Sequence, residues 1–171
     1  MREKWIVETK KGDFNGLSAK LKVSPVAVRC LMNRGVESEQ EMREFLYGTL
    51  DDLHDPFLMK GMDEAVREIV KAKEQGRKVA IASDFDCDGI FSAYILWKGF
   101  QKIGLDSEIF TPDRVKEGYG LNRRIVDEAL AGGRDFLVTC DNGIAANEEV
   151  DYAKKLGMTV IVTDHHEVQE Q

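Results

Sequence analysis

The chain has 171 residues, of which 43% are hydrophobic and 32% are charged, and its 31 acidic and 24 basic residues give a net charge of −7. This composition is typical of a globular protein with one core and a small additional lobe, and the acidic excess argues against a surface that binds nucleic acid over its whole extent. The apolar runs are far shorter than the roughly 20 residues of a membrane span, and the amino-terminal residues lack the apolar core of a signal peptide. Because the three cysteines form no CxxC pair, we expect reduced thiols in a cytoplasmic protein without membrane contact.

Residues 1–60 are expected to form a small helical lobe. Ser24, followed by a proline, suits the start of one helix, and Gly35 suits a stop after it. Ser38 and Glu41 have the spacing of a capping box before a further helix. Two short helices around a turn could also indicate a DNA-reading helix-turn-helix, but no basic recognition helix follows, so a packing lobe is the favoured interpretation.

The remaining residues, 61–171, alternate between helical patterns and short apolar strands. Strands are expected at KVAIAS, SEIF, DFLVT and MTVIVT, with helices at residues 62–76, 91–104, 122–133 and 146–157. Because the strands are almost continuously apolar and separated by helices, they indicate an α/β fold with a parallel, Rossmann-like sheet that is covered on both faces.

Polar side chains with metal-binding or catalytic chemistry follow three of these strands. They are Asp84, Asp86 and Asp88 after the first strand, Asp141 after the third, and Asp164, His165 and His166 after the fourth. Because open α/β sheets bind ligands at the carboxyl ends of their strands, we expect these clusters to meet in space.

The stretch DFDCDG at residues 84–89 has several interpretations when it is considered alone. A solvated turn is one, and an aspartyl-nucleophile phosphatase, in which a strand delivers D-x-D, is another. An EF-hand calcium loop is excluded, because the twelfth position holds Ile95 in place of a glutamate and a strand precedes the loop.

The TDHH stretch at residues 163–166 favours a metal site. Two of the three histidines of the chain stand side by side after an aspartate at a strand end. Carboxylate and imidazole ligands together suit Mn²⁺, with Mg²⁺, Fe²⁺ or Co²⁺ as other occupants. Several carboxylates around one pocket are typical of two bridged ions that promote in-line attack on phosphorus.

The motifs DFDCDG, TCDNGI and TDHH, in this order, resemble the first three motifs of the DHH phosphoesterases. The stretches RGVESEQEMREFL, LHDPFLMKGMDEAV and EGYGLN further resemble the amino-terminal part of the RecJ-type members, which are 5′ to 3′ single-strand DNA exonucleases. The resemblance extends from about Arg34 to Glu167. It implies a metal-dependent hydrolase of phosphodiester bonds that uses Mn²⁺ or Mg²⁺, with two ions in the complete enzyme. It also implies a role in DNA recombination and repair, with single-stranded DNA and replication or repair proteins as partners.

The resemblance also implies roles for individual residues. By this resemblance, the metal ligands of the chain would be Asp84, Asp86, Asp88, Asp141 and His165, with Asp141 bridging two ions. The catalytic residues would be His166, facing the scissile phosphate as a proton donor or charge stabiliser, and Asp164, orienting the histidines. A metal-activated water would be the nucleophile.

Three further residues are candidates for substrate binding. In the loop that contains EGYGLN, Tyr119 could stack on a base and Arg114 could bind phosphate, although a surface loop with a buried tyrosine is an equal alternative. Asn142 could position the backbone after Asp141 or form a plain turn. Cys87 and Cys140 are interpreted as packing residues, on the assumption of extended backbone.

Two other functions remain open at this stage. One is a DHH phosphoesterase that acts on short oligonucleotides, cyclic dinucleotides or pyrophosphate, and the other is a non-catalytic replication scaffold with a DHH fold. In RecJ-type enzymes a fourth motif with another metal-binding aspartate, a second domain and an oligonucleotide-binding fold follow the DHH stretch. The part from residue 61 to Gln171 is therefore expected to be an incomplete DHH domain.

Overall fold

The computed structural model describes residues 10–168, which belong to two compact units, Met1–Leu58 and Met59–Gln171. Within the described residues, none of the helices combines the length and apolar character needed to cross a bilayer.

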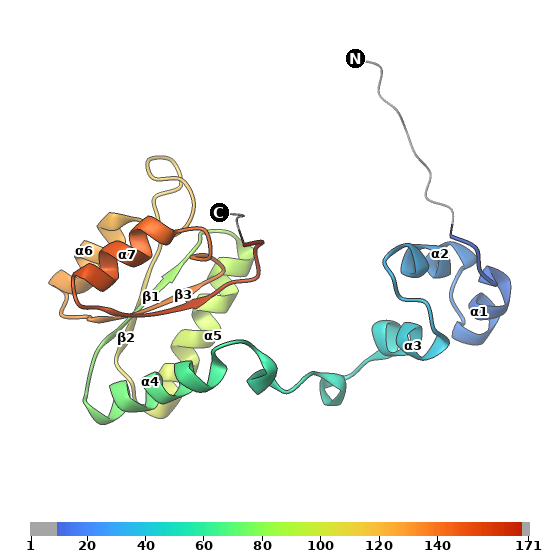
Figure 1. Ribbon diagram of the computed structural model, residues 1–171, viewed down its shortest axis with the longest axis horizontal. Helices are drawn as coiled ribbons and strands as arrows, with labels where there is room; N and C mark the ends of the chain where they lie inside the picture. The colour runs from blue at the N-terminus through green and yellow to red at the C-terminus, as the bar shows by residue number, and fades with distance from the viewer. Residues whose placement is uncertain (1–9, 169–171) are drawn as a thin grey trace, which may run out of the picture. The chain divides into compact units, whose positions relative to one another are not determined.

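The first unit contains three short helices, α1 (Phe14–Leu21), α2 (Pro25–Asn33) and α3 (Glu39–Tyr47), followed by single turns at η1 (Leu50–Asp52) and η2 (Pro56–Leu58) (Figure 1). Local signals define the helix ends as expected. The side chain of Ser24 caps α2, and Ser38 and Glu41 form a reciprocal capping box at α3. The small core of this unit consists of Leu21, Val28, Leu31, Met32 and Met42.

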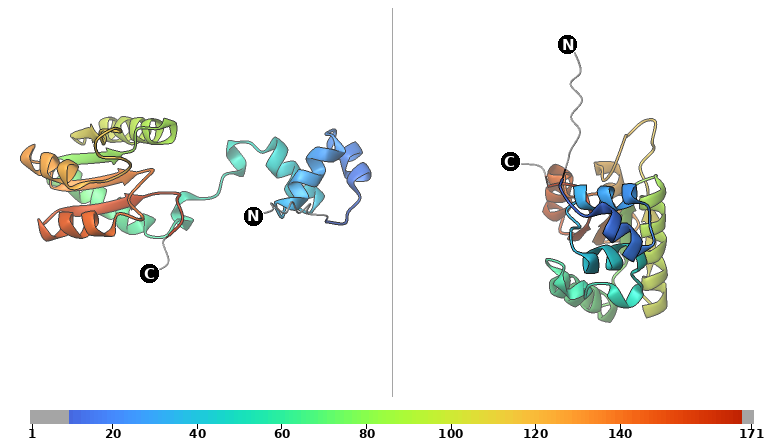
Figure 2. Two further views of the ribbon diagram at one scale, coloured as in Figure 1. Left: turned by 90° about the horizontal axis from the view of Figure 1, so that it is seen from above. Right: turned by 90° about the vertical axis from the view of Figure 1, so that its right-hand side faces the viewer.

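The second unit is a parallel four-stranded sheet between two layers of helices (Figures 1 and 2). In chain order its elements are α4 (Met62–Glu74), β1 (Val79–Ser83), α5 (Cys87–Ile103), β2 (Ser107–Phe110), α6 (Arg123–Ala131), β3 (Phe136–Cys140), α7 (Asn147–Lys155) and β4 (Thr159–Thr163). The predicted α/β class and parallel sheet are confirmed.

The order of the strands is β2-β1-β3-β4, so the chain moves outward from β1 to β2 and then returns to the other side of β1. Because parallel crossovers are right-handed, this reversal places the helix before it, α5, and the helix after it, α6, on opposite faces of the sheet. Helices α4 and α5 pack on the face that contains Ile81 and Val138, and α6 and α7 pack on the face that contains Ala80 and Leu137. The crevice at such a reversal is where open α/β sheets bind ligands. Here it lies between the carboxyl ends of β1 and β3.

The largest departure from the expected elements is the start of α5. The helix begins at Cys87, four residues earlier than predicted, because the carboxylate of Asp86 caps it by accepting a hydrogen bond from the amide of Gly89 (3.0 Å). Asp88 is therefore part of the first helical turn and not of a loop. Cys87 is exposed on the same turn, so its interpretation as a packing residue was wrong, whereas Cys140 is buried as expected.

Candidate metal centre

The turn that joins β1 to α5 brings a helix terminus unusually close to a strand end. A Cβ atom added to Gly89 would lie 2.5 Å from the carbonyl oxygen of Asp84, which no side chain could tolerate without a backbone shift. This contact explains the glycine of DFDCDG. Asp84 is itself buried, and its carboxylate accepts a hydrogen bond from the amide of Phe85 (2.7 Å).

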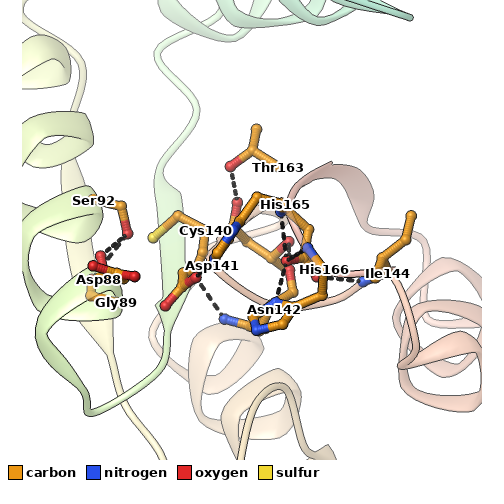
Figure 3. Close-up of polar contacts among 12 residues, drawn as sticks. Asp88, Gly89, Ser92, Cys140, Asp141, Asn142, Ile144, Thr163, His165 and His166 are labelled. Atoms are coloured by element: carbon orange, nitrogen blue, oxygen red, sulfur yellow. Dashed lines mark hydrogen bonds and ion pairs between the residues drawn. The ribbon is translucent and has the colours of Figure 1, made fainter. Parts of the chain in front are cut away.

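The three aspartates of this stretch have different surroundings. Asp86 is exposed, and the hydrogen bond from the Gly89 amide holds the pKa of its carboxyl below the usual value. Asp88 is also exposed, and among the described residues no hydrogen bond to its carboxylate is found, although its backbone carbonyl accepts one from Ser92 Oγ (2.7 Å). In Figure 3, Asp88 lies on α5, to one side of the residues that follow β3 and β4.

Asp141, directly after β3, has a left-handed backbone with φ of 60°. For a residue other than glycine this conformation costs on the order of 1–3 kcal/mol, although aspartate tolerates it better than most. The residue is 7% exposed, and burial raises the pKa of its carboxyl, with the neighbouring Asp86 carboxyl adding to the shift. A cation beside these two carboxylates would offset both effects.

The two histidines after β4 contact different carboxylates. His165 Nε2 lies 2.7 Å from Asp141 Oδ1, and His166 Nδ1 lies 2.7 Å from Asp164 Oδ1. The hydrogen bond to Asp164 raises the pKa of the His166 imidazole above its usual value. Asp141, His165 and His166 each offer a ligand atom within 4.8 Å of those of the other two (Figure 3). In the described part of the chain, Asp84, Asp86 and Asp88 are outside this group.

Asp164 is the organising residue of the histidine segment. One carboxylate oxygen accepts hydrogen bonds from the amides of His165 (2.8 Å) and His166 (3.1 Å), and the other accepts one from the amide of Ile144 (3.0 Å). Burial acts to raise the pKa of this carboxyl, but the hydrogen bonds from Ile144 and His166 outweigh it and lower the pKa. Asp164 therefore fixes the turn after β4 to the turn after β3.

A cavity of about 520 Å³ opens beside this cluster. Its wall contains Asp84, Asp141, Asp164 and His166 from the strand ends, together with residues 117 and 119–122 from the loop before α6 and residues 142–146 and 149 from the turn before and the first part of α7. The three strand-end clusters thus contribute to one cavity, although the ligand atoms that meet most closely come from β3 and β4.

The predicted substrate-binding residues are divided between the surface and the interior. Tyr119 is 73% exposed, so the alternative of a buried tyrosine was wrong. Its ring centroid lies 4.8 Å from that of Phe85, and the Arg114 guanidinium lies 5.0 Å from the same phenylalanine centroid. Sequence reasoning did not single out Phe85, although it occupies the second position of DFDCDG. Asn142, in contrast, is buried and lines the cavity.

The loop that carries Arg114 and Tyr119 is anchored to α6. Arg124 donates hydrogen bonds to the carbonyl of Thr111 (3.1 Å) and to the carboxylate of Glu117 (2.8 Å). The pairing with Arg124 lowers the pKa of Glu117 to about 2. This ion pair ties the loop that carries Tyr119, a residue of the cavity wall, to α6.

The fold and the cluster together define an α/β protein with carboxylate and imidazole side chains at the carboxyl edge of a parallel sheet. Residues 78–171 match the family model described as DHH family, N-terminal domain. This match covers more than half of the chain, and the chain therefore belongs to the DHH family.

Relatives and solved structures agree with this assignment. The chain is 37% identical over 165 residues to the single-stranded-DNA-specific exonuclease RecJ of Bacillus subtilis (strain 168), a match that covers 96% of this chain and 21% of the relative. A crystal structure of exonuclease RecJ bound to manganese is 35% identical with a TM-score of 0.61, over 66% of this chain and 29% of that chain. RecJ of Thermus thermophilus in complex with Mn²⁺ is 29% identical with a TM-score of 0.65, over 92% of this chain and 22% of that one. The chain thus spans about a fifth to a quarter of the length of the curated relatives that it matches.

Proposed function

We propose that this chain is the metal-binding part of a RecJ-like exonuclease that hydrolyses single-stranded DNA from the 5′ end in cytoplasmic DNA recombination and repair. The single observation that supports the proposal most strongly is the convergence of Asp141, His165 and His166 within 4.8 Å at the edge of the sheet. The likeness to RecJ proteins of known metal content, at 29% and 35% identity, supports the same conclusion.

The donor set fits a hard or borderline divalent cation, either Mn²⁺ or Mg²⁺. Asp141 Oδ1 and His165 Nε2 lie 2.7 Å apart, and a bound cation would offset the burial that raises the pKa of the Asp141 carboxyl. We propose that Asp141 and His165 would hold one cation. Asp84, Asp86 and Asp88 would complete a site for two cations, with Asp141 as the carboxylate shared by both. The bound cation would lower the pKa of a water and neutralise charge on phosphoryl oxygens.

The other residues of the cavity would bind and orient the substrate. With its Nδ1 on Asp164 and its pKa raised, His166 stays protonated to higher pH and can donate a proton from Nε2 to a leaving oxygen. Asp164 keeps that ring in place. Tyr119, in the wall of the cavity, would contact a base, Arg114, which lies over the Phe85 ring, would contact a phosphate, and Asn142 lines the cavity. Single-stranded DNA and proteins of replication or repair are the proposed partners.

The metal centre is tested by calorimetric titration of Mn²⁺ into the 171-residue chain and its Asp141→Ala variant. Loss of a direct ligand should weaken binding by more than the roughly 10- to 100-fold that follows the loss of a residue that only orients a ligand. Asp151→Ala is the matched control, because Asp151 is an exposed aspartate on α7 outside the cluster. Equal binding by all three folded proteins would contradict the metal site.

The nuclease function is tested in a chimera in which these 171 residues replace the matching segment of the Bacillus subtilis RecJ protein. We expect the chimera to release nucleotides from the 5′ end of single-stranded DNA in the presence of Mn²⁺. His166→Ala should lower turnover by about 10²- to 10⁴-fold while Mn²⁺ affinity is largely retained. A folded chimera that binds Mn²⁺ and degrades only short oligonucleotides or cyclic dinucleotides would contradict the proposed substrate.

A further inference from the structure

The structure assigns to Asn142 a positioning role: its side-chain amide joins the ends of β1 and β3 and thereby holds the Asp141 carboxylate against His165. Asn142 follows Asp141 directly and is 7% exposed. The effect of this positioning role on metal binding rests on the proposed function, but the positioning of Asp141 against His165 does not.

The amide group of Asn142 bridges the two central strands. Nδ2 donates hydrogen bonds to the carbonyl oxygens of Ala82 (3.1 Å), near the end of β1, and of Cys140 (2.9 Å), at the end of β3. Because both partners are carbonyl oxygens, only the nitrogen of the amide can face them, which fixes the orientation of the side chain. The register of the ladder ends with Ser83 opposite Cys140, so the amide adds a link where the ladder stops.

The backbone of Asn142 is held from the opposite side. The hydroxyl of Thr139, which is fully buried, donates a hydrogen bond to the carbonyl oxygen of Asn142 (2.7 Å). At Gly143, where φ is 111°, a Cβ atom would lie 2.6 Å from the same hydroxyl oxygen, so the chain passes too close to β3 for any side chain. The residues on either side of Asp141 are thus fixed to the sheet.

The left-handed backbone of Asp141 is the consequence of this arrangement. A residue that would otherwise avoid a φ of 60° is kept there because Thr139, Asn142 and Gly143 determine the path of the turn. The turn aims the Asp141 carboxylate at His165 Nε2, 2.7 Å away. Without the two amide donors of Asn142, the backbone of Asp141 can relax to a common conformation, and its carboxylate would leave the histidine.

The variant that tests this inference is Asn142→Asp. It keeps the size of the side chain but places a carboxylate oxygen against two carbonyl oxygens, where the amide had donated two hydrogen bonds. The matched control is Asn147→Asp, which introduces the same charge at an exposed residue outside the cavity wall. Asn147 is the first residue of α7, where the helix dipole favours a negative charge, so this variant should fold.

The first readout needs no metal. The chain has three histidines, so the ring nitrogen resonances of each can be assigned by NMR in the metal-free protein at one fixed pH. We expect the His165 ring signals of Asn142→Asp to lose the signature of a hydrogen bond at Nε2, while those of His54 are unchanged and Asn147→Asp matches the parent. Unchanged His165 signals in a folded Asn142→Asp variant would overturn the inference.

The second readout is Mn²⁺ affinity, measured well below the unfolding temperature. Although Asn142→Asp adds a negative charge near the proposed cation, we expect affinity to fall by about 10- to 100-fold, as for other residues that orient a ligand. The control should bind as well as the parent or better. If the parent itself binds no Mn²⁺ while the His165 signature still depends on Asn142, the positioning role stands and the proposed metal centre fails.

A second pair of variants addresses the case in which Asn142→Asp does not fold. Thr139→Val removes the hydroxyl that holds the Asn142 carbonyl, and Thr139→Ser retains it. We expect the valine variant to lose part of the His165 signature and the serine variant to restore it. Equal signals from both variants would show that the turn is not held in this way and would overturn the inference.

Discussion

The two halves of the candidate site are held in place by different means. In the half formed by β3 and β4, the side chain of Asp164 bonds to amides from two separate turns, and His165 reaches across to Asp141. In the half formed by β1 and α5, Asp84 and Asp86 bond to amides of their own turn, at Phe85 and Gly89.

The difference shows how each half resists change. Contacts between separate elements couple the histidines to the whole edge of the sheet, so a change at one residue should affect several. Contacts within one turn make the half formed by β1 and α5 depend on how closely α5 approaches β1. The following predictions test this distinction.

The largest effect on stability is expected in the half formed by β3 and β4, where contacts join separate elements. Asp164→Ala removes the acceptor for the amides of Ile144, His165 and His166, and the free energy of unfolding should fall by about 3 kcal/mol. Asp88→Ala is the comparison from the other half, and it should cost only about 0.5 kcal/mol through the dipole of α5. Urea denaturation of both variants measures the difference, and similar losses would argue against the distinction.

A somewhat smaller effect on stability should follow from a change in the half formed by β1 and α5. Gly89→Ala forces a methyl group to within 2.5 Å of the Asp84 carbonyl, so the start of α5 must move and the protein should lose roughly 1–3 kcal/mol of stability. Gly99→Ala, on the exposed side of the same helix with nothing within 4 Å, should instead stabilise the protein by roughly 0.5–1 kcal/mol. Thermal unfolding of the two variants tests the prediction, which requires opposite signs.

The smallest effect concerns the titration of two neighbouring carboxyls in the metal-free protein. Because the Gly89 amide lowers the pKa of Asp86, its ionised form favours the folded state, and that contribution is lost as pH falls below about 3.8. Burial raises the pKa of Asp141, so its protonated form favours the folded state, and that contribution is lost as pH rises through the raised pKa.

Carboxyl carbon NMR measures both midpoints directly. The midpoint of Asp86 should lie below 3.8 and that of Asp141 above it. Two midpoints on the same side of the ordinary aspartate value would show that the two halves do not differ electrostatically as the structure indicates.

Several features could be predicted from the sequence because local interactions determine them. The capping box of Ser38 and Glu41 involves residues three positions apart, and the alternation of helices and apolar strands follows from periodicity. The position of Asp141 and of the TDHH stretch after strands follows from the same alternation, and parallel strands bring such positions to one edge.

Other features depend on contacts between distant residues, which no local pattern specifies. The amide of Asn142 contacts Ala82, sixty positions earlier in the chain, and the contact between the tilted rings of Phe85 and Tyr119 joins two separate loops. The exposure of Cys87 also escaped prediction, because it follows from the early start of α5.

The sequence by itself determined the family, the order of the elements and which residue types lie at the edge of the sheet. These are consequences of hydrophobic pattern, capping and motif order along the chain. The tertiary structure alone decided that Asp141 adopts a left-handed backbone, that Asp164 holds both histidines, and that the Asn142 amide bonds to the carbonyl of Ala82. The physical reason is that hydrogen-bond geometry between separate strands is fixed only when the sheet has formed and its core has packed.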